Sequence, residues 1–406
     1  MSTDKTILFI GHEATRTGAP KSLLQIIRWF KVNTSYNLKL LLLRGGELCE
    51  EYAQYATVLL YENIKPVQKL SIKNRIIHKV FALIEARHKV SSKTTNKIHR
   101  VLIGEFNFQK RLAEIIEQHF GSINLIFNNT TVTADLVNNL ILLDAPVISR
   151  IAEMGLSYSP QFDVLNRRTK HFFVVSKAVR DDLIKRYSIN PERITILYGT
   201  IYPEDEENKG IETLNIREKL AFGKNSFIVM GSGSRSYRKG VDLFVQVAIQ
   251  TYKINKDIIF IWLGGCDDKY LGEFIKEEKQ IIKEYSNLYF INSVPKPSLY
   301  YKEINLFLMT SREDPFPLVN LEVGLQKKTI ISFENNGGSP ELIKDGETGY
   351  LVPFLDTSAM TDKILKIYNG EEASLGENLY KEIISNYTQE SSGQLLKKFI
   401  NKELNI

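Results

Sequence analysis

The chain has 406 residues, of which 43% are hydrophobic and 25% charged, as in an ordinary globular protein. This length allows two or three domains, and no run approaches the ~18 apolar residues of a membrane-spanning helix. The formal net charge of +6 favours an anionic partner, and we expect no nucleic-acid partner. Two distant cysteines and an opening without signal-peptide character predict a cytoplasmic protein.

Twelve short apolar runs alternate with segments of helical periodicity. The runs are ILFIG, LKLLLL, TVLLY, LIFNN, PVISRI, FFVVS and ITILYG, then FIVMG, IIFIWLGG, LYFINS, LFLMTS and TIISF. Most are continuously apolar, which is typical of parallel strands covered on both faces. Segments such as APKSLLQIIRWFKV and VDLFVQVAIQTYK repeat apolar residues at three and four spacing. The alternation predicts doubly wound α/β sheets.

Twelve strands exceed the usual size of one sheet, and the polar stretch YGTIYPEDEENKG lacks periodicity. We place a domain boundary there. Each half opens with a strand, a glycine-containing loop and a helix, which predicts two Rossmann-like domains facing each other across a cleft. The expected domains are 1–200 and 201–385, with a C-terminal helix over 386–406 that packs back on the first domain.

Residues 65–100 hold ten Lys or Arg against one acidic residue, Glu85. The stretch IIHKVFALIEARHKV can gather its apolar residues on one helical face. Because polybasic segments bind anionic lipid, this segment predicts docking to a membrane surface. A solvated, charged helical insertion explains the same residues.

The stretch SREDPFPLVNLE, residues 311–322, carries the main candidate site. Proline is favoured at the first helical position, so we expect a helix from about Pro317. The free amides of Leu318 and Val319 would form an anion site at the positive end of the helix dipole. Glu322 would lie roughly 7 Å further along the axis, where its carboxylate can accept hydrogen bonds from a diol such as a ribose.

Asp314, on the loop before this helix, can bind sugar hydroxyls on the other side of the phosphate. The stretch therefore predicts a site for a nucleotide diphosphate sugar. An acidic loop followed by a helix with a solvated glutamate is the alternative.

A second motif, GSGSRSYRKGVD, follows a predicted strand. Gly231 and Gly233 let the backbone approach a ligand closely. Arg238 and Lys239 precede a helix that we expect to begin near Gly240, and two cations at a helix start suit a pyrophosphate whose charge grows as the sugar bond breaks. A basic turn exposed to water is the alternative.

Two further motifs predict helix starts. In NNGGSPELIKDG, Ser339 is expected to cap a helix with Pro340 at its first position. In HEATRTGAPKSLL, Gly18 and Ala19 form a small-residue loop and Pro20 begins a helix. This loop either faces the pyrophosphate or is a tight strand-to-helix turn. Motifs of the Asp-x-Asp, HExxH, CxxC and P-loop types are absent from the sequence, so we expect neither a metal ion nor another cofactor.

Together these segments resemble the retaining glycosyltransferases of family four (glycosyl transferases group 1), which have the two-domain GT-B fold. The resemblance is strongest over 226–354 and 7–30, and most specific where SREDPFPLVNLE is followed by GGSPELIKDGETGYLVP. It implies a metal-independent hexosyltransferase that uses a UDP- or GDP-sugar and a glycan or lipid-linked acceptor. The implied setting is bacterial surface polysaccharide (O-antigen or capsule) synthesis at the inner face of the membrane.

The resemblance also implies residue roles. Asp314 takes the place of the first Glu of the family's E-x7-E motif and would contact the donor sugar, Glu322 would hold the ribose, and Lys239 would bind the diphosphate. Gly18 and Ala19 match the glycine-rich acceptor-side loop. The implied donor-binding residues are Gly233, Arg238, Lys239, Asp314, Phe316, Pro317, Leu318, Val319 and Glu322.

Two positions depart from the family. Ser234 stands where an Arg is usual, and Arg238 or Arg235 would supply that charge. Ala152 replaces a His placed near C6 of the donor sugar, so either the donor has an altered C6, as in a 6-deoxy sugar, or a neighbour takes over the role. Glu153 lies beside it as a further candidate. The alternative functions are a GT-B-like sugar-nucleotide epimerase and a non-catalytic glycan- or membrane-binding protein.

Overall fold

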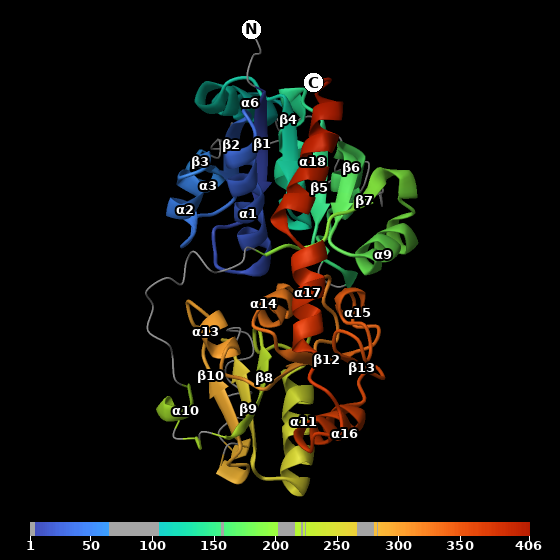
Figure 1. Ribbon diagram of the computed structural model, residues 1–406. Helices are drawn as coiled ribbons and strands as arrows, with labels where there is room; N and C mark the ends of the chain where they lie inside the picture. The colour runs from blue at the N-terminus through green and yellow to red at the C-terminus, as the bar shows by residue number, and fades with distance from the viewer. Residues whose placement is uncertain are drawn as a thin grey trace, which may run out of the picture. The chain divides into compact units, whose positions relative to one another are not determined.

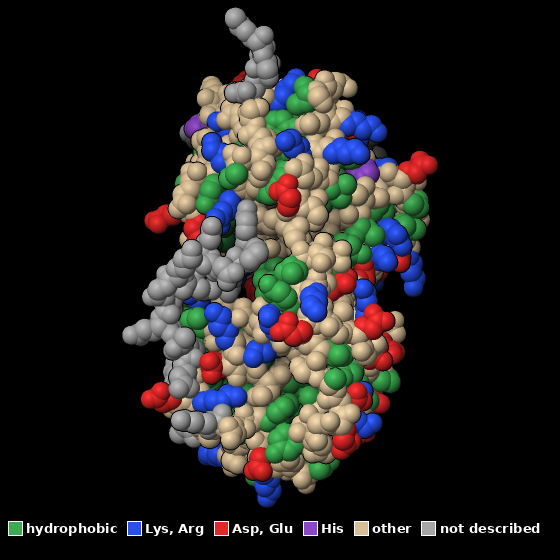
Figure 2. All heavy atoms as spheres, viewed as in Figure 1, with side chains coloured by type: hydrophobic (Ala, Val, Ile, Leu, Met, Phe, Trp, Pro, Cys, Tyr) green, Lys and Arg blue, Asp and Glu red, His purple; other side chains and the backbone are tan. Residues whose placement is uncertain are grey.

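The computed structural model describes residues 5–64, 105–155, 158–201, 216–220, 222–223, 225–265, 280–281 and 283–406. The basic segment 65–100 and Cys266 lie outside these ranges, so the predicted membrane docking stays a prediction. Within the described ranges, every helix is too short or too polar to span a bilayer. Figure 2 shows positive and negative side chains interspersed over the described part of one face of the protein.

The chain divides into two compact units, one comprising Met1–Ile151, Tyr158–Phe172 and Asn401–Ile406, the other Ala152–Ser157 and Phe173–Ile400. The first sheet has the strand order β3-β2-β1-β4-β5-β6-β7 (Figure 1), and the pairs from β3 to β5 are parallel. Its strands are β1 (Thr6–Gly11), β2 (Asn37–Leu42), β3 (Thr57–Leu60), β4 (Leu125–Asn128), β5 (Val147–Ile151), β6 (Thr169–Val174) and β7 (Ile194–Ile196).

Several helices accompany this sheet, and α1 shows how such a helix packs. In α1, Leu23, Ile27 and Phe30 recur at four and three spacing and are buried, which is the pattern of an amphipathic helix on a sheet. The helices are α1 (Gly18–Asn33), α2 (Cys49–Ala53), α3 (Tyr61–Ile64), α6 (Glu105–Phe120), α7 (Ala134–Asn139), α8 (Phe162–Arg168) and α9 (Lys177–Tyr187).

The second sheet has the order β10-β9-β8-β11-β12-β13, and all its pairs are parallel. The strands are β8 (Phe227–Ser232), β9 (Ile258–Leu263), β10 (Leu288–Ile291), β11 (Leu306–Met309), β12 (Thr329–Phe333) and β13 (Tyr350–Val352). The helices are α10 (Ile216–Lys219), α11 (Val241–Ile254), α13 (Ser298–Tyr301), α14 (Leu318–Leu325), α15 (Ser339–Leu342), α16 (Thr357–Tyr368), α17 (Gly376–Asn386) and α18 (Gln389–Glu403).

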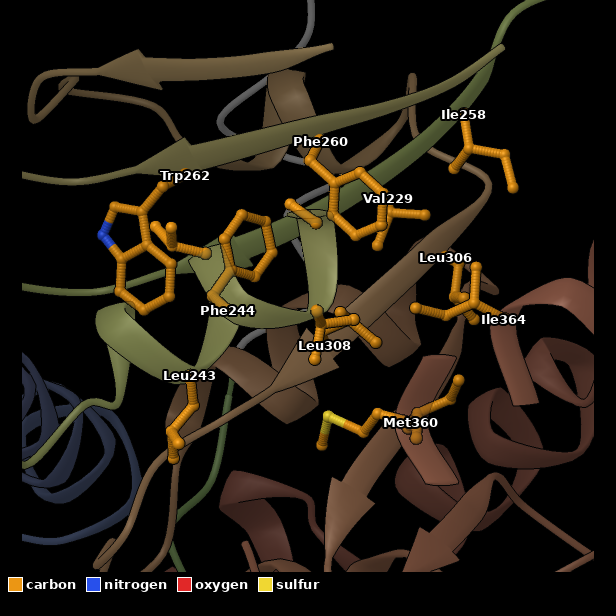
Figure 3. Close-up of a cluster of buried hydrophobic side chains, with 14 of the residues drawn as sticks. Val229, Leu243, Phe244, Ile258, Phe260, Trp262, Leu306, Leu308, Met360 and Ile364 are labelled. Atoms are coloured by element: carbon orange, nitrogen blue, oxygen red, sulfur yellow. The ribbon is translucent and has the colours of Figure 1, made fainter. Parts of the chain in front are cut away.

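An apolar core joins this sheet to α11 and α16 (Figure 3). Phe244 from α11 makes edge-to-face contacts with Phe260 and Trp262 from β9, at centroid distances of 5.7 and 5.3 Å. Gly231 in β8 leaves room for these rings, since a Cβ there would lie 2.8 Å from Trp262 and 2.9 Å from Phe244. The core therefore fixes β8 and the start of α11, between which the basic motif lies.

The predicted α/β class with two doubly wound sheets is confirmed, and the twelve predicted strands are β1 to β12. The sequence analysis missed β13, which has only three residues. The first sheet ends at Ile196 and the second begins at Phe227, while the proposed domain ranges stay a prediction. The end of α18 belongs to the first unit, where Lys170 Nζ lies 2.5 Å from Glu403 Oε2.

Candidate functional site

The strand order of the second sheet reverses between β8 and β11, which are neighbours in space. In open α/β sheets, ligands bind outside the carboxyl ends of the strands at such a reversal. The two loops that leave these ends are 233–240 and 310–317. They carry the basic motif and the acidic motif, so the fold brings the two main sequence candidates together.

Lys239 and Asp314 form an ion pair at the centre of these loops. Lys239 Nζ lies 2.5 Å from Asp314 Oδ2, and the two side chains are only 16% and 7% exposed. Arg238 Nη1 lies 3.7 Å from the same oxygen and donates a 2.9 Å hydrogen bond to the Glu313 carbonyl. The carboxylate of Asp314 therefore holds both predicted phosphate-binding cations in place.

Arg312 ties the two loops together. Its guanidinium donates two hydrogen bonds to Asp242, at 2.7 and 2.6 Å, and a third to the Tyr237 carbonyl at 2.7 Å. It also stacks on the Tyr237 ring at 3.9 Å, and its backbone amide donates to the Arg238 carbonyl at 2.9 Å. The hydrogen bonds to Asp242 raise the pKa of Arg312. Sequence analysis missed the contacts of Arg312 with Asp242 and Tyr237, because a pair of residues far apart in the chain has no local sequence pattern.

A third loop supports Asp314 through the backbone. The Asp314 amide donates to the Asn336 carbonyl at 2.7 Å, and the Gly338 amide donates to the Asp314 carbonyl at 2.8 Å. Gly337 lies between them at φ +112°, and a Cβ there would lie 2.1 Å from the Asp314 carbonyl oxygen. Only glycine fits this approach, which is the physical reason for the GG pair in the sequence.

The helix that follows Asp314 begins one residue later than predicted. Pro317 is the N-cap, with an extended ψ of 108°, and Leu318 is the first helical residue. The Pro317 carbonyl accepts the Asn320 amide at 3.0 Å. Leu318 and Val319 form the start of the first turn, and Glu322 lies half-buried in the second turn of the same helix.

Gly233 and Arg235 differ in their relation to the ion pair. Gly233 has φ +142°, and a Cβ there would lie 3.3 Å from Lys239 Cδ. The absence of a side chain at Gly233 therefore leaves room for the methylene groups of Lys239. Arg235 is buried, its ring-facing guanidinium is 5.1 Å from the Phe290 centroid, and Nη2 donates to Asn292 at 3.2 Å. Of the two candidate arginines, Arg238 is therefore the one beside Asp314.

The segment after β5 contributes Ala152 and Glu153 to the second unit. Glu153 Oε2 accepts the Ala152 amide at 3.0 Å, so this carboxylate folds back on the amide of the preceding residue. Gly155 adopts φ +53°, and its amide donates to Asp182 Oδ2 at 3.1 Å. The conformation of this short segment is thus set by two carboxylates.

Glu313 is a candidate that the sequence analysis missed. Its carboxylate packs on Gly155 so closely that a Cβ there would lie 2.1 Å from Glu313 Oε2. Burial raises the pKa of Glu313, Arg238 opposes this shift, and Asp182 adds to it. The sequence analysis identified an acidic loop at the neighbouring Asp314. It could not predict that Asp314 pairs with Lys239 while Glu313 packs on Gly155.

The first unit places Gly18 and Ala19 inside the first turn of α1, so the prediction of a loop with Pro20 starting the helix is wrong. Thr17 is the N-cap in extended conformation, and the Ala19 carbonyl accepts a 3.0 Å hydrogen bond from Asn129 after β4.

The capping role predicted for Ser339 is also wrong, because this residue is itself helical.

Within the described residues, no group of three or more His, Cys, Asp or Glu side chains is arranged to hold a metal ion. The expectation that the protein uses neither a metal nor another cofactor stays a prediction.

Residues 212–388 match the family model for glycosyl transferases group 1. This region of the chain is similar to that family. It contains Lys239, Asp314 and the whole of α14, and the recognition made from the sequence is confirmed.

Curated relatives match about two fifths of the chain. The poly(ribitol-phosphate) alpha-N-acetylglucosaminyltransferase of Staphylococcus aureus is 26% identical over 40% of this chain and 32% of its own length. The lipopolysaccharide core biosynthesis mannosyltransferase LpcC of Rhizobium leguminosarum is 24% identical over 42% of this chain and 50% of its own length. The matched part thus spans half or less of these two relatives.

Solved structures match nearly the whole chain. The crystal structure of Anabaena HepE in complex with UDP and glucose has a TM-score of 0.74 at 16% identity, covering 97% of this chain and 99% of that chain. The lipopolysaccharide outer core galactosyltransferase WaaB has a TM-score of 0.69 at 12% identity, covering 98% and 99%. The predicted GT-B fold class is confirmed.

Proposed function

We propose that the protein is a retaining, metal-independent glycosyltransferase. It moves a hexose from a UDP- or GDP-sugar to a glycan or lipid-linked glycan in the synthesis of a bacterial surface polysaccharide. The proposal rests on the convergence of Lys239, Asp314 and the start of α14 at the strand-order reversal of the second sheet. The relatives named above support the substrate classes, since they include enzymes of lipopolysaccharide and poly(ribitol phosphate) glycosylation and a neighbour solved with UDP.

The diphosphate of the donor would bind the first amides of α14, at Leu318 and Val319, together with Lys239. A helix start concentrates unpaired N–H groups and partial positive charge, which suits a phosphate. As the bond to the sugar breaks, negative charge grows on the leaving diphosphate, and Lys239 and Arg238 would stabilise it. In this scheme the side chain of Asp314 positions the Lys239 ammonium group beside the diphosphate and also binds donor-sugar hydroxyls. Glu322 binds the ribose.

The amide of Phe316 precedes this helix and would contact the sugar. Gly18 and Ala19, at the start of α1, would contact the acceptor. At Ala152, where the family has a histidine, the donor would carry an altered C6, as in a 6-deoxy sugar, or Glu313 would supply the missing polar group. The contact between Glu313 and Gly155 favours the second of these.

Calorimetry with a panel of UDP- and GDP-sugars tests the donor site, and sugar release without acceptor tests the chemistry. We expect Lys239→Ala and Glu322→Ala each to weaken donor binding by about tenfold or more, because each removes a charged partner of the nucleotide. Lys253→Ala, at an exposed lysine near the end of α11, is the matched control and should bind as the wild type does. Wild-type affinity in both site variants would refute the proposed donor site.

The same panel separates the alternative functions. A sugar-nucleotide epimerase would convert the donor without an acceptor, and a non-catalytic binding protein would release no sugar. Association with the inner membrane surface through residues 65–100 is a separate proposal. Flotation with anionic vesicles at low salt tests it, and protein that stays entirely in the bottom fraction would refute it.

A further inference from the structure

Glu341, in the first turn of α15, caps a helix that lies far away in sequence. Its Oε2 accepts the Lys177 amide at 2.9 Å and its Oε1 accepts the Ala178 amide at 3.0 Å. Ser176 accepts the next amide, that of Val179, at 3.1 Å. The otherwise unpaired amides at the start of α9 are thereby satisfied, with a negative charge at the positive end of its dipole.

The same carboxylate also holds Tyr198. The Tyr198 hydroxyl donates a 3.0 Å hydrogen bond to Glu341 Oε2, and burial, followed by the charge of Glu341, raises the pKa of this tyrosine. Tyr387 donates its hydroxyl to the Glu341 carbonyl at 3.2 Å. One glutamate therefore fixes the start of α9 and two tyrosine side chains.

The two tyrosine rings enclose Phe316 of the acidic motif. The centroid of Phe316 lies 5.4 Å from that of Tyr198 and 5.6 Å from that of Tyr387, and the phenylalanine is only 7% exposed. Gly199 closes the enclosure, since a Cβ there would lie 3.0 Å from the Phe316 ring and 2.7 Å from Leu318 Cδ2. Phe316 and Leu318 therefore pack directly against the backbone of Gly199, the residue that follows Tyr198.

We infer that Glu341 is a positioning residue of the donor site. By holding Tyr198 it fixes Phe316, and with it the backbone between Asp314 and the first amides of α14. The inference rests on the proposed function, because it assigns these amides to a nucleotide diphosphate. A glutamine would keep the shape of Glu341 but turn an N–H₂ group toward a backbone N–H or the Tyr198 hydroxyl, so it would lose hydrogen bonds that the carboxylate accepts.

The test titrates UDP and GDP into the full-length protein and its variants by calorimetry. We expect Glu341→Gln and Tyr198→Ala each to weaken binding of the preferred nucleotide by about tenfold. The reason is that the amides of Leu318 and Val319, once displaced, would no longer donate well to the phosphate. Tyr198→Phe keeps the ring and should weaken binding less than Tyr198→Ala. In transfer assays the donor KM should rise by the same factor while kcat at saturating donor changes little. Glu347→Gln, at an exposed glutamate of the following loop, is the matched control.

A variant that is less stable but binds the nucleotide as the wild type does would show that Glu341 is merely structural and would overturn the inference. If Glu341→Gln does not fold, Tyr198→Ala decides, because it leaves the cap on α9 intact, and unchanged affinity there overturns the inference as well. A wild-type protein that binds neither UDP nor GDP would refute the proposed function itself, which is a distinguishable outcome.

Discussion

Replacing Lys239 by methionine removes the ammonium group from a largely buried ion pair and keeps most of the apolar stem. Asp314 would then retain its charge at 7% exposure. Removing one partner of a buried pair costs about 3–5 kcal/mol, because the remaining charge is uncompensated. We expect the lower value, about 3 kcal/mol, since Arg238 lies 3.7 Å from the same carboxylate and replaces part of the lost interaction.

The complementary change, Asp314→Asn, leaves Lys239 without its carboxylate. Because the lysine is more exposed than the aspartate, at 16%, we expect a smaller loss of about 2 kcal/mol. The double variant removes both charges of the pair and leaves only Arg238, whose side chain is 40% exposed, without its carboxylate. It should lose about 3 kcal/mol rather than the sum of the two single losses. The expected coupling energy is therefore about 2 kcal/mol, within the range for residues in direct contact.

Urea denaturation followed by tryptophan fluorescence can measure these values. The sequence has two tryptophans, and Trp262 lies in the core of the second unit beside Phe244. In a Trp29→Phe background, the signal of Trp262 reports the unit that contains the ion pair. Strictly additive single losses would refute the reasoning, because additivity would mean that the two charges do not stabilise each other.

Two further predictions concern the same loops. Burial raises the pKa of Glu313 above its ordinary value of 4.5, so the folded protein favours the protonated acid and loses stability as pH rises through that raised pKa. Glu313→Gln should therefore gain stability relative to the wild type as the pH rises from below 4.5 to neutrality, and parallel urea midpoints over that range would contradict this. Gly337→Ala should cost about 2 kcal/mol, since its Cβ would meet the Asp314 carbonyl at 2.1 Å. Gly346→Ala, also at positive φ but in open space, is the control, and an equal loss in thermal midpoint for the two would show that contact with Asp314 is not the cause.

The local pattern of the sequence was enough to predict the class of fold. Continuous apolar runs of strand length, separated by helical periodicity, have few solutions other than parallel sheets covered by helices. The same local chemistry identified the acidic and basic motifs, because glycine, proline and charge at a strand end are properties of a few adjacent residues. It did not fix the helix starts at Gly18 and Leu318 to the residue, since flanking backbone conformation decides them.

Only the tertiary structure decided which charges meet. The sequence allowed either Arg238 or Arg235 to supply the charge missing at Ser234, and the turn after β8 directs Arg235 to Phe290 and Arg238 to Asp314. The pairing of Glu341 with the start of α9 spans more than 160 residues, so no local pattern could reveal it. Sequence specifies what each segment can form by itself, whereas the contacts between distant loops depend on the order in which the strands lie in the sheet.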